Sequence, residues 1–503
     1  MKNNKMLIVN FVATMIAFLV NALINFFLSS YIVNSVGEEA YGFVQLANTF
    51  ITYFTVITIA INSMSSRFIS IEYYKKKFDS AKEYYSSTFW ANIAIVIISI
   101  PMIFFFVYNI EKYVDISPDL IKDVKLLFLF LSANLYLGLL TTNLTVSYYI
   151  KNKLYISSFL NMLNYVIKAI ILYFMYVNFS PYVAFVGVAT FIAMVIIQIF
   201  NLYFKKKLIP EIKIGKFNFE KVKVLVSSGF WNSITRLGNI LSEGLDLFIA
   251  NIFLNSNVMG VLAIIKIIPN TISSVLSSLV TIFMPNMTEV YAKGSNEDFT
   301  YIVKKSMKFI GVLFNIPIIC VIVLGGVLFN LWFPTLDANL LYILSILAIT
   351  PWIVVGPLSV MHNVFTVINK IKVNSIVICL GGIVNVIIVY ILLKLTNLGI
   401  FAIVGVSSLI SVIRNILYTL PYSSKYMGVK CSYFLPEILK SLLSVIINIV
   451  IGFVIREVFN PVSWISLILT GITICVISFI INVMIFYNKD EIKRFIKGDV
   501  VNG

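Results

Sequence analysis

The chain matches itself at an offset of about 218 residues, within strongly apolar sequence. Gly42 corresponds to Gly260, and each glycine opens a predicted helix after a short loop. Two further matches share the register: Asn152-Lys153 with Asn369-Lys370, and Val186-Gly187-Val188 with Val404-Gly405-Val406. The matches predict two related bundles of membrane helices. Such a duplication is typical of transporters, in which one bundle moves against the other around a site between them.

Composition excludes an ordinary soluble domain. The 503 residues are 60% hydrophobic and 12% charged, mean hydropathy is +0.96, and apolar runs of ~20 residues recur from end to end. The first run follows Lys2 and Lys5 and reaches about Val33. It is too long for the core of a signal peptide, so we expect a retained first helix.

The hydropathy pattern predicts an all-α polytopic membrane protein with fourteen transmembrane helices. We expect two homologous six-helix lobes around a central cavity, followed by two trailing helices. The predicted domains are residues 1–212, residues 213–427, and residues 428–503, the last with a cytoplasmic tail. The predicted spans are 6–33, 42–66, 87–108, 124–149, 156–178, 181–204, 224–254, 260–288, 305–333, 338–366, 373–395, 398–420, 437–458 and 463–487.

Charge predicts the orientation. With the N-terminus in the cytoplasm, the inner segments hold most of the 38 lysine and arginine residues. The outer segments hold only Lys112, Lys122, Lys125, Lys394 and Arg456. This positive-inside pattern requires an even number of spans and places both termini in the cytoplasm. The net charge of +16 therefore indicates topology rather than nucleic-acid binding, although the basic runs 75–77 and 205–207 also suit anionic inner-leaflet lipid.

Motifs for catalysis or metal binding are missing from the sequence. The four cysteines have no metal-ligand spacing, and there is no phosphate-binding glycine loop or nucleophile elbow. The single histidine, His362, lies inside a predicted span beside Asn363 and is interpreted as a packed residue rather than a proton carrier. We therefore expect no enzyme activity and no cofactor.

Polar residues inside the spans carry the functional information. On the seventh predicted span, five polar residues follow at spacings of three and four, which places them on one face of a straight helix. They are Asn232, Arg236, Asn239, Glu243 and Asp246. Similar stripes are Asn10, Thr14, Asn21 and Asn25 on span one, Gln45, Asn48, Thr52, Thr55 and Asn62 on span two, and Lys266, Asn270, Ser273, Ser277 and Thr281 on span eight.

Two interpretations of these stripes stay open, because polar groups cannot face lipid without a partner. One is hydrogen bonding that holds helices together, at well under ~2 kcal/mol per contact. The other, which we favour, is a shared hydrated cavity, because the stripes lie on the first two spans of each half.

Asp246 and Lys266 are predicted to lie at similar depth, ~15 Å below the outer surface, on adjoining antiparallel spans. Asn25 and Asn48 occupy the matching positions of the first half. A structural clamp and a functional switch are both compatible with this ion pair.

The charges predict the chemistry of the cavity. Arg236, Lys168 and Lys266 would attract an anionic substrate such as a phosphate or pyrophosphate. Glu243 and Asp246 are the candidates for coupling to a proton or sodium gradient. The amides that would hydrogen-bond a sugar are Asn21, Asn25, Gln45, Asn48, Asn239 and Asn270.

Local motifs then add a resemblance over nearly the whole chain. They are Gly37-Glu38-Glu39-Ala40-Tyr41-Gly42 after span one, Ser66-Arg67-Phe68 closing span two, and Ser228-Gly229-Phe230-Trp231 opening span seven. With the span count and the repeat, the chain resembles the multidrug/oligosaccharidyl-lipid/polysaccharide exporter superfamily. Its closest likeness is to the polysaccharide-transport branch, the Wzx-type flippases of O-antigen and capsule repeat units.

The resemblance implies a V-shaped pair of lobes that opens alternately to each side of a bacterial inner membrane. The substrate implied is an undecaprenyl-pyrophosphate-linked oligosaccharide, moved from the inner to the outer leaflet for surface polysaccharide biosynthesis. Arg236, Lys168 and Lys266 would then hold the pyrophosphate and sugar. The implied partners are membrane lipid and the polysaccharide polymerase and glycosyltransferases of the same pathway, with the flippase itself a monomer.

Three alternatives remain open. A cation-coupled drug exporter of the same superfamily would need only twelve spans, and a flippase of the peptidoglycan precursor lipid II has fourteen. The third is a membrane polysaccharide polymerase or glycosyltransferase, which would use a sizeable outer loop. The longest outer loop predicted here, about residues 109–123, is short and acidic, and we interpret it as a solvated surface.

Overall fold

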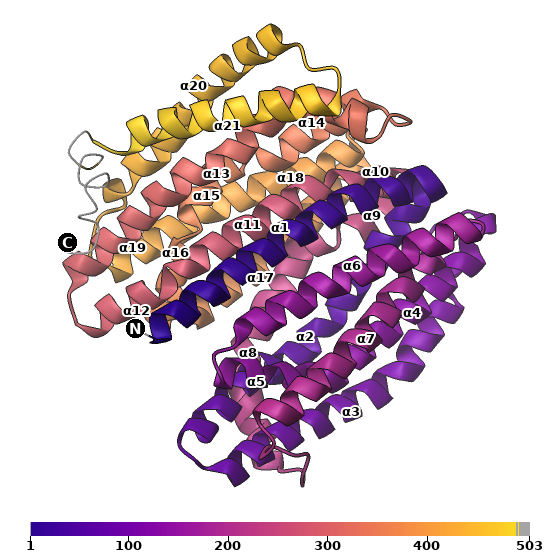
Figure 1. Ribbon diagram of the computed structural model, residues 1–503. Helices are drawn as coiled ribbons and strands as arrows, with labels where there is room; N and C mark the ends of the chain where they lie inside the picture. The colour runs from indigo at the N-terminus through magenta and orange to yellow at the C-terminus, as the bar shows by residue number, and fades with distance from the viewer. Residues whose placement is uncertain (1, 489–490, 492–503) are drawn as a thin grey trace. The chain divides into compact units, whose positions relative to one another are not determined.

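The protein was analysed as a computed structural model that describes residues 2–488 and 491. All regular structure within these residues is helical (Figure 1). The chain forms two compact units, Met1–Ile264 and Ile265–Gly503. The domain boundaries 1–212, 213–427 and 428–503 stay a prediction from the repeat, and most of the predicted cytoplasmic tail lies outside the described residues.

The helices of the first unit are α1 (Lys2–Val36), α2 (Glu38–Tyr74), α3 (Phe78–Tyr108), η1 (Ile110–Lys112), η2 (Pro118–Leu120), α4 (Ile121–Thr141), η3 (Thr142–Thr145), α5 (Val146–Ile150), α6 (Leu154–Asn178), α7 (Ala184–Leu208), α8 (Phe219–Asn239), η4 (Ile240–Gly244), α9 (Asp246–Phe253) and α10 (Ser256–Ile265), whose last residue begins the second unit. Those of the second unit are α11 (Ile267–Ile282), α12 (Met284–Ala292), α13 (Asn296–Trp332), α14 (Ala338–Ile349), α15 (Trp352–Leu358), α16 (Met361–Val367), α17 (Ile371–Leu395), α18 (Ile400–Arg414), η5 (Asn415–Thr419), α19 (Leu420–Tyr426), η6 (Cys431–Tyr433), α20 (Leu435–Phe459) and α21 (Trp464–Phe486).

Twelve helical stretches among the described residues are long and apolar enough to cross a membrane. The first of them, Val12–Tyr74, includes most of α1 and all of α2, whereas α8 is not among the twelve. The protein is therefore a multi-pass helical membrane protein. The number fourteen and the division into six-helix lobes stay predictions.

The sequence repeat recurs in the backbone. Asn152 and Asn369 both adopt left-handed backbone conformations, with φ of 50° and 55°. The following lysine amides donate to carbonyls five residues back, Lys153 to Tyr148 and Lys370 to Phe365, at 2.8 Å each. Asparagine tolerates this conformation better than most residues with a side chain. The Asn-Lys match therefore encodes one tight turn between helices, used twice.

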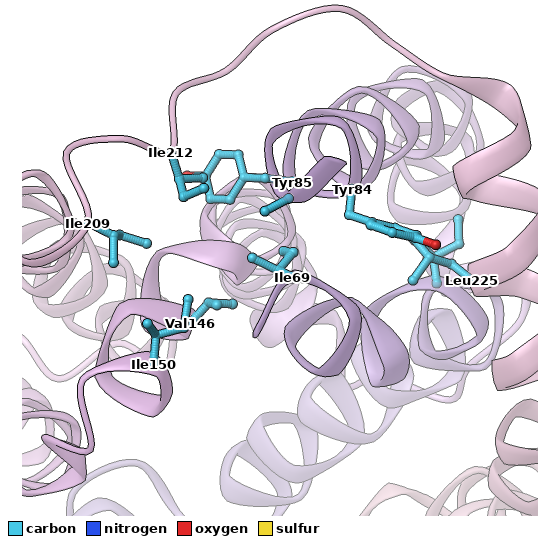
Figure 2. Close-up of a cluster of buried hydrophobic side chains, with 10 residues drawn as sticks. Ile69, Tyr84, Tyr85, Val146, Ile150, Ile209, Ile212 and Leu225 are labelled. Carbon is cyan, nitrogen blue, oxygen red and sulfur yellow. The ribbon is translucent and has the colours of Figure 1, made fainter. Parts of the chain in front are cut away.

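Within the first unit, α2 packs against α3 and α8, α1 against α6, and α7 against α4 and α6. Figure 2 shows a buried cluster at the end where α2 finishes and α3 begins. Its residues are Ile61, Ile69, Ala81, Tyr84, Tyr85, Val146, Ile150, Ile209, Ile212 and Leu225. The cluster joins α2, α3 and α5 to the segment that connects α7 with α8.

In the second unit, α13 packs against both trailing helices, α20 and α21, which also lie side by side (Figure 1). A buried polar network joins them. The Asn315 amide on α13 donates to the hydroxyls of Ser441 (3.0 Å) and Ser444 (2.8 Å). On the next turns, Asn448 donates to Asn482 at 2.9 Å, and Asn482 donates to the Val312 carbonyl at 2.8 Å. Interhelical hydrogen bonds of this kind fix trailing helices to a bundle.

Candidate functional site

The first seam of polar residues lies between α2 and α8. Gly229 allows the helices to approach closely, because a Cβ there would collide with the Ala60 carbonyl. Further along, Asn232 donates to the Ser63 hydroxyl at 3.1 Å, and the Arg236 Nε donates to the Thr55 hydroxyl at 3.2 Å. The predicted stripes of spans two and seven therefore meet within one unit, and a half-buried guanidinium lies on their seam.

A π-helical turn, η4, interrupts the stripe of the seventh span. The Tyr53 hydroxyl on α2 donates to the Gly244 carbonyl in this turn at 2.8 Å. Asn239 and Glu243 are exposed, whereas Asp246 beyond the turn is only 3% exposed. The prediction that all five residues share one face is therefore wrong at Asp246, because a π turn adds a residue and shifts the register.

The second seam lies between α1 and α6, which run parallel. At its start, Asn10 bonds the turn at Asn152 and accepts from the Tyr155 amide, and the Thr14 and Ser158 hydroxyls are 2.9 Å apart. At its other end, the ring centroid of Tyr31 lies 6.0 Å from that of Tyr173 and 5.7 Å from that of Tyr176. A nearly constant offset along the two helices follows.

Between these ends, that register places Asn21 and Asn25 level with the α6 segment that carries Asn164 and Lys168. The Oδ1 atoms of Asn21 and Asn164 are buried and accept no hydrogen bond within the described part of the chain. Lys168 is half-buried and has no ion pair or hydrogen bond to the described residues. We call Asn21, Asn25, Asn164 and Lys168 the open cluster. Polar groups inside a membrane bundle need water or a polar ligand as partner.

The other predicted site residues are more dispersed. Gln45 donates to the Tyr41 hydroxyl at 2.8 Å, and Asn48 donates to the Val44 carbonyl on its own helix at 2.9 Å. Lys266 and Asn270 belong to the second unit, where Lys266 is half-buried and Asn270 is exposed. A common cavity for all of these residues, and the ion pair of Asp246 with Lys266, stay predictions.

Sequence reasoning missed a clasp formed by the loop after α3. The Asp115 amide donates to the Asn251 side chain at 2.8 Å, and the Asp115 carboxylate accepts from the Ser256 amide at 3.2 Å, which caps α10. The Glu39 carboxylate at the start of α2 accepts from the amide and hydroxyl of Ser117, at 3.1 and 2.8 Å. Asp115 is exposed, as the interpretation of a solvated surface expects, but its carboxylate also caps a helix.

The repeat-related glycines lie beside this clasp. A Cβ on Gly42 would lie 2.8 Å from the Gly260 Cα, and a Cβ on Gly260 would collide with the Glu38 carbonyl. Only residues without a side chain allow α2 and α10 to cross here. At the base of the loop, the Lys125 ammonium pairs with Glu111 at 2.8 Å and holds the pKa of that carboxyl below its usual value.

Metal-binding chemistry finds little support in the side chains. Among the described residues, no group of three or more His, Cys, Asp or Glu side chains could hold a metal ion. In the second unit, the ring centroid of His362 lies 6.4 Å from that of Phe365. The recognisable features are thus hydrogen-bonding and cationic groups within helices, which suit binding and transport.

Known proteins resemble the chain over most or all of its length. It is 28% identical to the uncharacterized membrane protein EpsK of Bacillus subtilis (strain 168), over 97% of this chain and 98% of EpsK. Its fold matches the lipid II flippase MurJ in an inward closed conformation, with a TM-score of 0.69, 16% identity, and coverage of 98% of this chain and 100% of MurJ. It also matches an inward-facing multidrug resistance MATE family transporter of the MOP superfamily, with a TM-score of 0.69, 12% identity, and coverage of 84% and 98%.

The MurJ match extends further along this chain than the MATE match does. The likenesses to solved structures establish the transporter fold. Residues 7–291, more than half of the chain, match the family model described as polysaccharide biosynthesis protein. The chain therefore belongs to the polysaccharide biosynthesis protein family.

Proposed function

We propose that this protein is a flippase that moves an undecaprenyl-pyrophosphate-linked oligosaccharide from the inner to the outer leaflet by alternating access. The family supports a role in polysaccharide biosynthesis. The open cluster supports an anionic, sugar-bearing substrate, because Lys168 lies level with two amide oxygens and none of the three has a partner among the described residues. A pyrophosphate would supply the acceptors and glycan hydroxyls the donors.

Arg236 is the second cation of the proposed site. Its Nε bonds one hydroxyl, Thr55, and the rest of the guanidinium fork is suited to two phosphate oxygens. Glu243 is exposed and lies within the π turn η4, and we propose that it couples transport to a proton or sodium gradient. Single-turn π-helical bulges inside α-helices frequently mark functional sites.

The test is flipping by purified protein in proteoliposomes that contain a fluorescent undecaprenyl-pyrophosphate oligosaccharide. Arg236→Ala should lower the flipping rate at least tenfold (about 1.4 kcal/mol), and Arg236→Lys should recover part of it. Arg67→Ala, an exposed arginine on α2, is the matched control. Unchanged flipping by the Arg236→Ala variant would return this residue to a structural role.

Lipid II is the second candidate substrate, because the MurJ fold matches nearly the whole chain, including the trailing helices. The same vesicles loaded with lipid II distinguish the two. Faster flipping of lipid II than of the repeat-unit lipid would replace the proposal. Efflux of organic cations with neither lipid flipped would favour a drug exporter of the MATE type.

We place the protein in a bacterial inner membrane with both termini in the cytoplasm. The proposed partners are the polymerase and glycosyltransferases of the pathway, with the flippase a monomer. Single cysteines at Ser35 and Ser80, in a cysteine-free background, should react oppositely with an impermeant thiol reagent, Ser35 from outside and Ser80 from inside. Reaction of both from the outside would reject this topology.

A further inference from the structure

The connection between α7 and α8 is not a free loop. Residues 209–218 contain no helix, yet Ile209 and Ile212 are fully buried in the cluster with Tyr85, Val146 and Ile150 (Figure 2). We call residues 209–219 the strap. Its beginning is fixed to α2, α3 and α5 by packing, so its later residues have a defined position.

The middle of the strap is fixed along α3. The Gly215 amide donates to the Ser86 hydroxyl at 2.6 Å, and the Trp90 indole donates to the Gly215 carbonyl at 3.1 Å. The Asn218 amide donates to the Ser87 hydroxyl at 2.9 Å. These α3 residues lie about 12–18 Å from the start of the helix at Phe78, at 1.5 Å per residue.

The predicted third span, residues 87–108, begins at this depth. Trp90 is partly exposed, and the exposed side chains of α3 beyond it include Ile97 and Ile98. Tryptophan is enriched where hydrocarbon meets headgroups, because its ring is apolar and its N–H is polar. Gly215, bonded to Trp90, therefore lies at the level where the apolar surface of α3 begins.

The outer face of the strap combines apolar and basic side chains. Ile214, Phe217 and Phe219 are 51%, 49% and 66% exposed. They alternate with Lys213 and Lys216, which are exposed and make no ion pair within the described part of the chain. Exposed apolar residues at membrane depth contact lipid, and adjacent lysines attract anionic headgroups.

We propose that the strap is an interfacial lipid-binding element, separate from the substrate site. Ile214, Phe217 and Phe219 insert among lipid chains, and Lys213 and Lys216 bind the phosphates of anionic lipids. The adjacent α7 end adds to the positive charge through Lys206 and Lys207, which are also exposed. The partner is an anionic bilayer lipid, because the hydrogen bonds of Gly215 and Asn218 to α3 hold the strap at the level where the apolar surface of α3 begins.

The first test measures insertion. A cysteine replacing Phe217, in a background with all four native cysteines changed to serine, carries an NBD label in nanodiscs that contain doxyl lipids. Asp79→Cys is the control, because Asp79 lies at the start of α3 with a side chain 96% exposed. Headgroup-proximal doxyl groups should quench the label at position 217 at least about twofold more than that at position 79. Equal quenching would overturn insertion.

The second test measures lipid preference. Native mass spectrometry compares retained phosphatidylglycerol and phosphatidylcholine on the wild type and on Lys213→Gln/Lys216→Gln. Removing each lysine should weaken phosphatidylglycerol binding about fivefold, equivalent to ~1 kcal/mol. Lys112→Gln/Lys122→Gln, which changes an exposed lysine in η1 and one in the first turn of α4, should change nothing. Retention of phosphatidylglycerol by the strap variant at the wild-type level would overturn the role of the lysines, whatever the flipping assay gives.

Discussion

The polar network of α13, α20 and α21 and the open cluster of α1 and α6 contain similar residues that differ in how many hydrogen bonds they make to neighbouring helices. In the network, the Asn315 and Asn482 amides donate to groups on neighbouring helices. In the open cluster, two amide oxygens and a lysine lack partners among the described residues. The difference teaches that residue type alone does not separate helix-holding polar groups from a binding site. The number of side-chain hydrogen bonds across helices differs between the two regions, although the Asn448 Oδ1 atom of the network also has no partner among the described residues. A buried polar atom without a hydrogen bond carries a free-energy cost.

The largest effect is expected for the predicted ion pair of Asp246 and Lys266, whose matching positions in the first half of the repeat are neutral. Asp246→Asn or Lys266→Asn alone should cost about 3 kcal/mol of stability, because one charge is left in a low-dielectric site. The double change to Asn should recover most of that, since the first half has Asn25 and Asn48 at the matching positions. Thermal unfolding in detergent provides the measurement.

Flipping by the double variant then sharpens the result. A stable but inactive double variant assigns the pair to the transport cycle, and an active one makes it a clamp. Silent single changes would mean that Asp246 and Lys266 do not meet.

A second change breaks the paired network. Asn315→Leu removes four side-chain hydrogen bonds. The Asn315 amide donates three, to the Ser441 carbonyl and to the Ser441 and Ser444 hydroxyls, and its oxygen accepts one from the Ser441 hydroxyl. Thermal unfolding should show a loss of about 2 kcal/mol. Flipping per folded molecule should stay near the wild-type rate. Asn161→Leu, at an exposed site on α6, is the matched control; equal losses in both variants would mean that the network contributes nothing specific.

The third change, in the open cluster, is expected to have the opposite effect: flipping falls while stability does not. Lys168→Met keeps the length of the side chain but removes the charge, so stability should stay level or rise. Flipping should fall at least tenfold, about 1.4 kcal/mol at the transition state. A variant that unfolds early yet flips normally would place Lys168 among the helix-holding residues.

The smallest effect is expected at Asn21. Asn21→Leu removes a buried oxygen that has no hydrogen-bond partner, so thermal unfolding should show a gain of under ~1 kcal/mol. Flipping should decline severalfold if the oxygen bonds a sugar hydroxyl. A loss of stability instead would indicate a protein partner for this amide and would weaken the contrast between the two regions.

Much of the architecture could be predicted because membrane burial leaves a strong hydropathy signal. The repeat was also readable, since Asn152 and Asn369 occupy a backbone conformation that few residues tolerate. The helical face on which Asp246 lies could not be predicted, because the spacing of three and four residues does not indicate the π turn that precedes it. Nor could the partners of polar residues, because Thr55 and Arg236 meet only through the packing of α2 on α8.

The outer clasp was missed for a related reason. Asp115 is an acidic residue in a short acidic loop, which is typical of a solvated surface. Its capping of α10 depends on folding that brings Ser256 beside it. One signal was available: Asn251 and Ser256 flank the short connection between α9 and α10, where unpaired amides require acceptors. Sequence alone did not say that these acceptors come from a loop more than a hundred positions earlier.

The crossing of Gly42 and Gly260 has an evolutionary consequence. Residues that are each other's copies in the repeat meet face to face, as they do in an isologous two-fold interface. A half-length ancestor could therefore have formed a symmetric dimer in which this glycine of one subunit contacts the same glycine of the other. In such a homodimer any side chain added at the position would collide twice. After gene fusion, the two positions can mutate independently. The close helix crossing still limits both of them to residues of the smallest size.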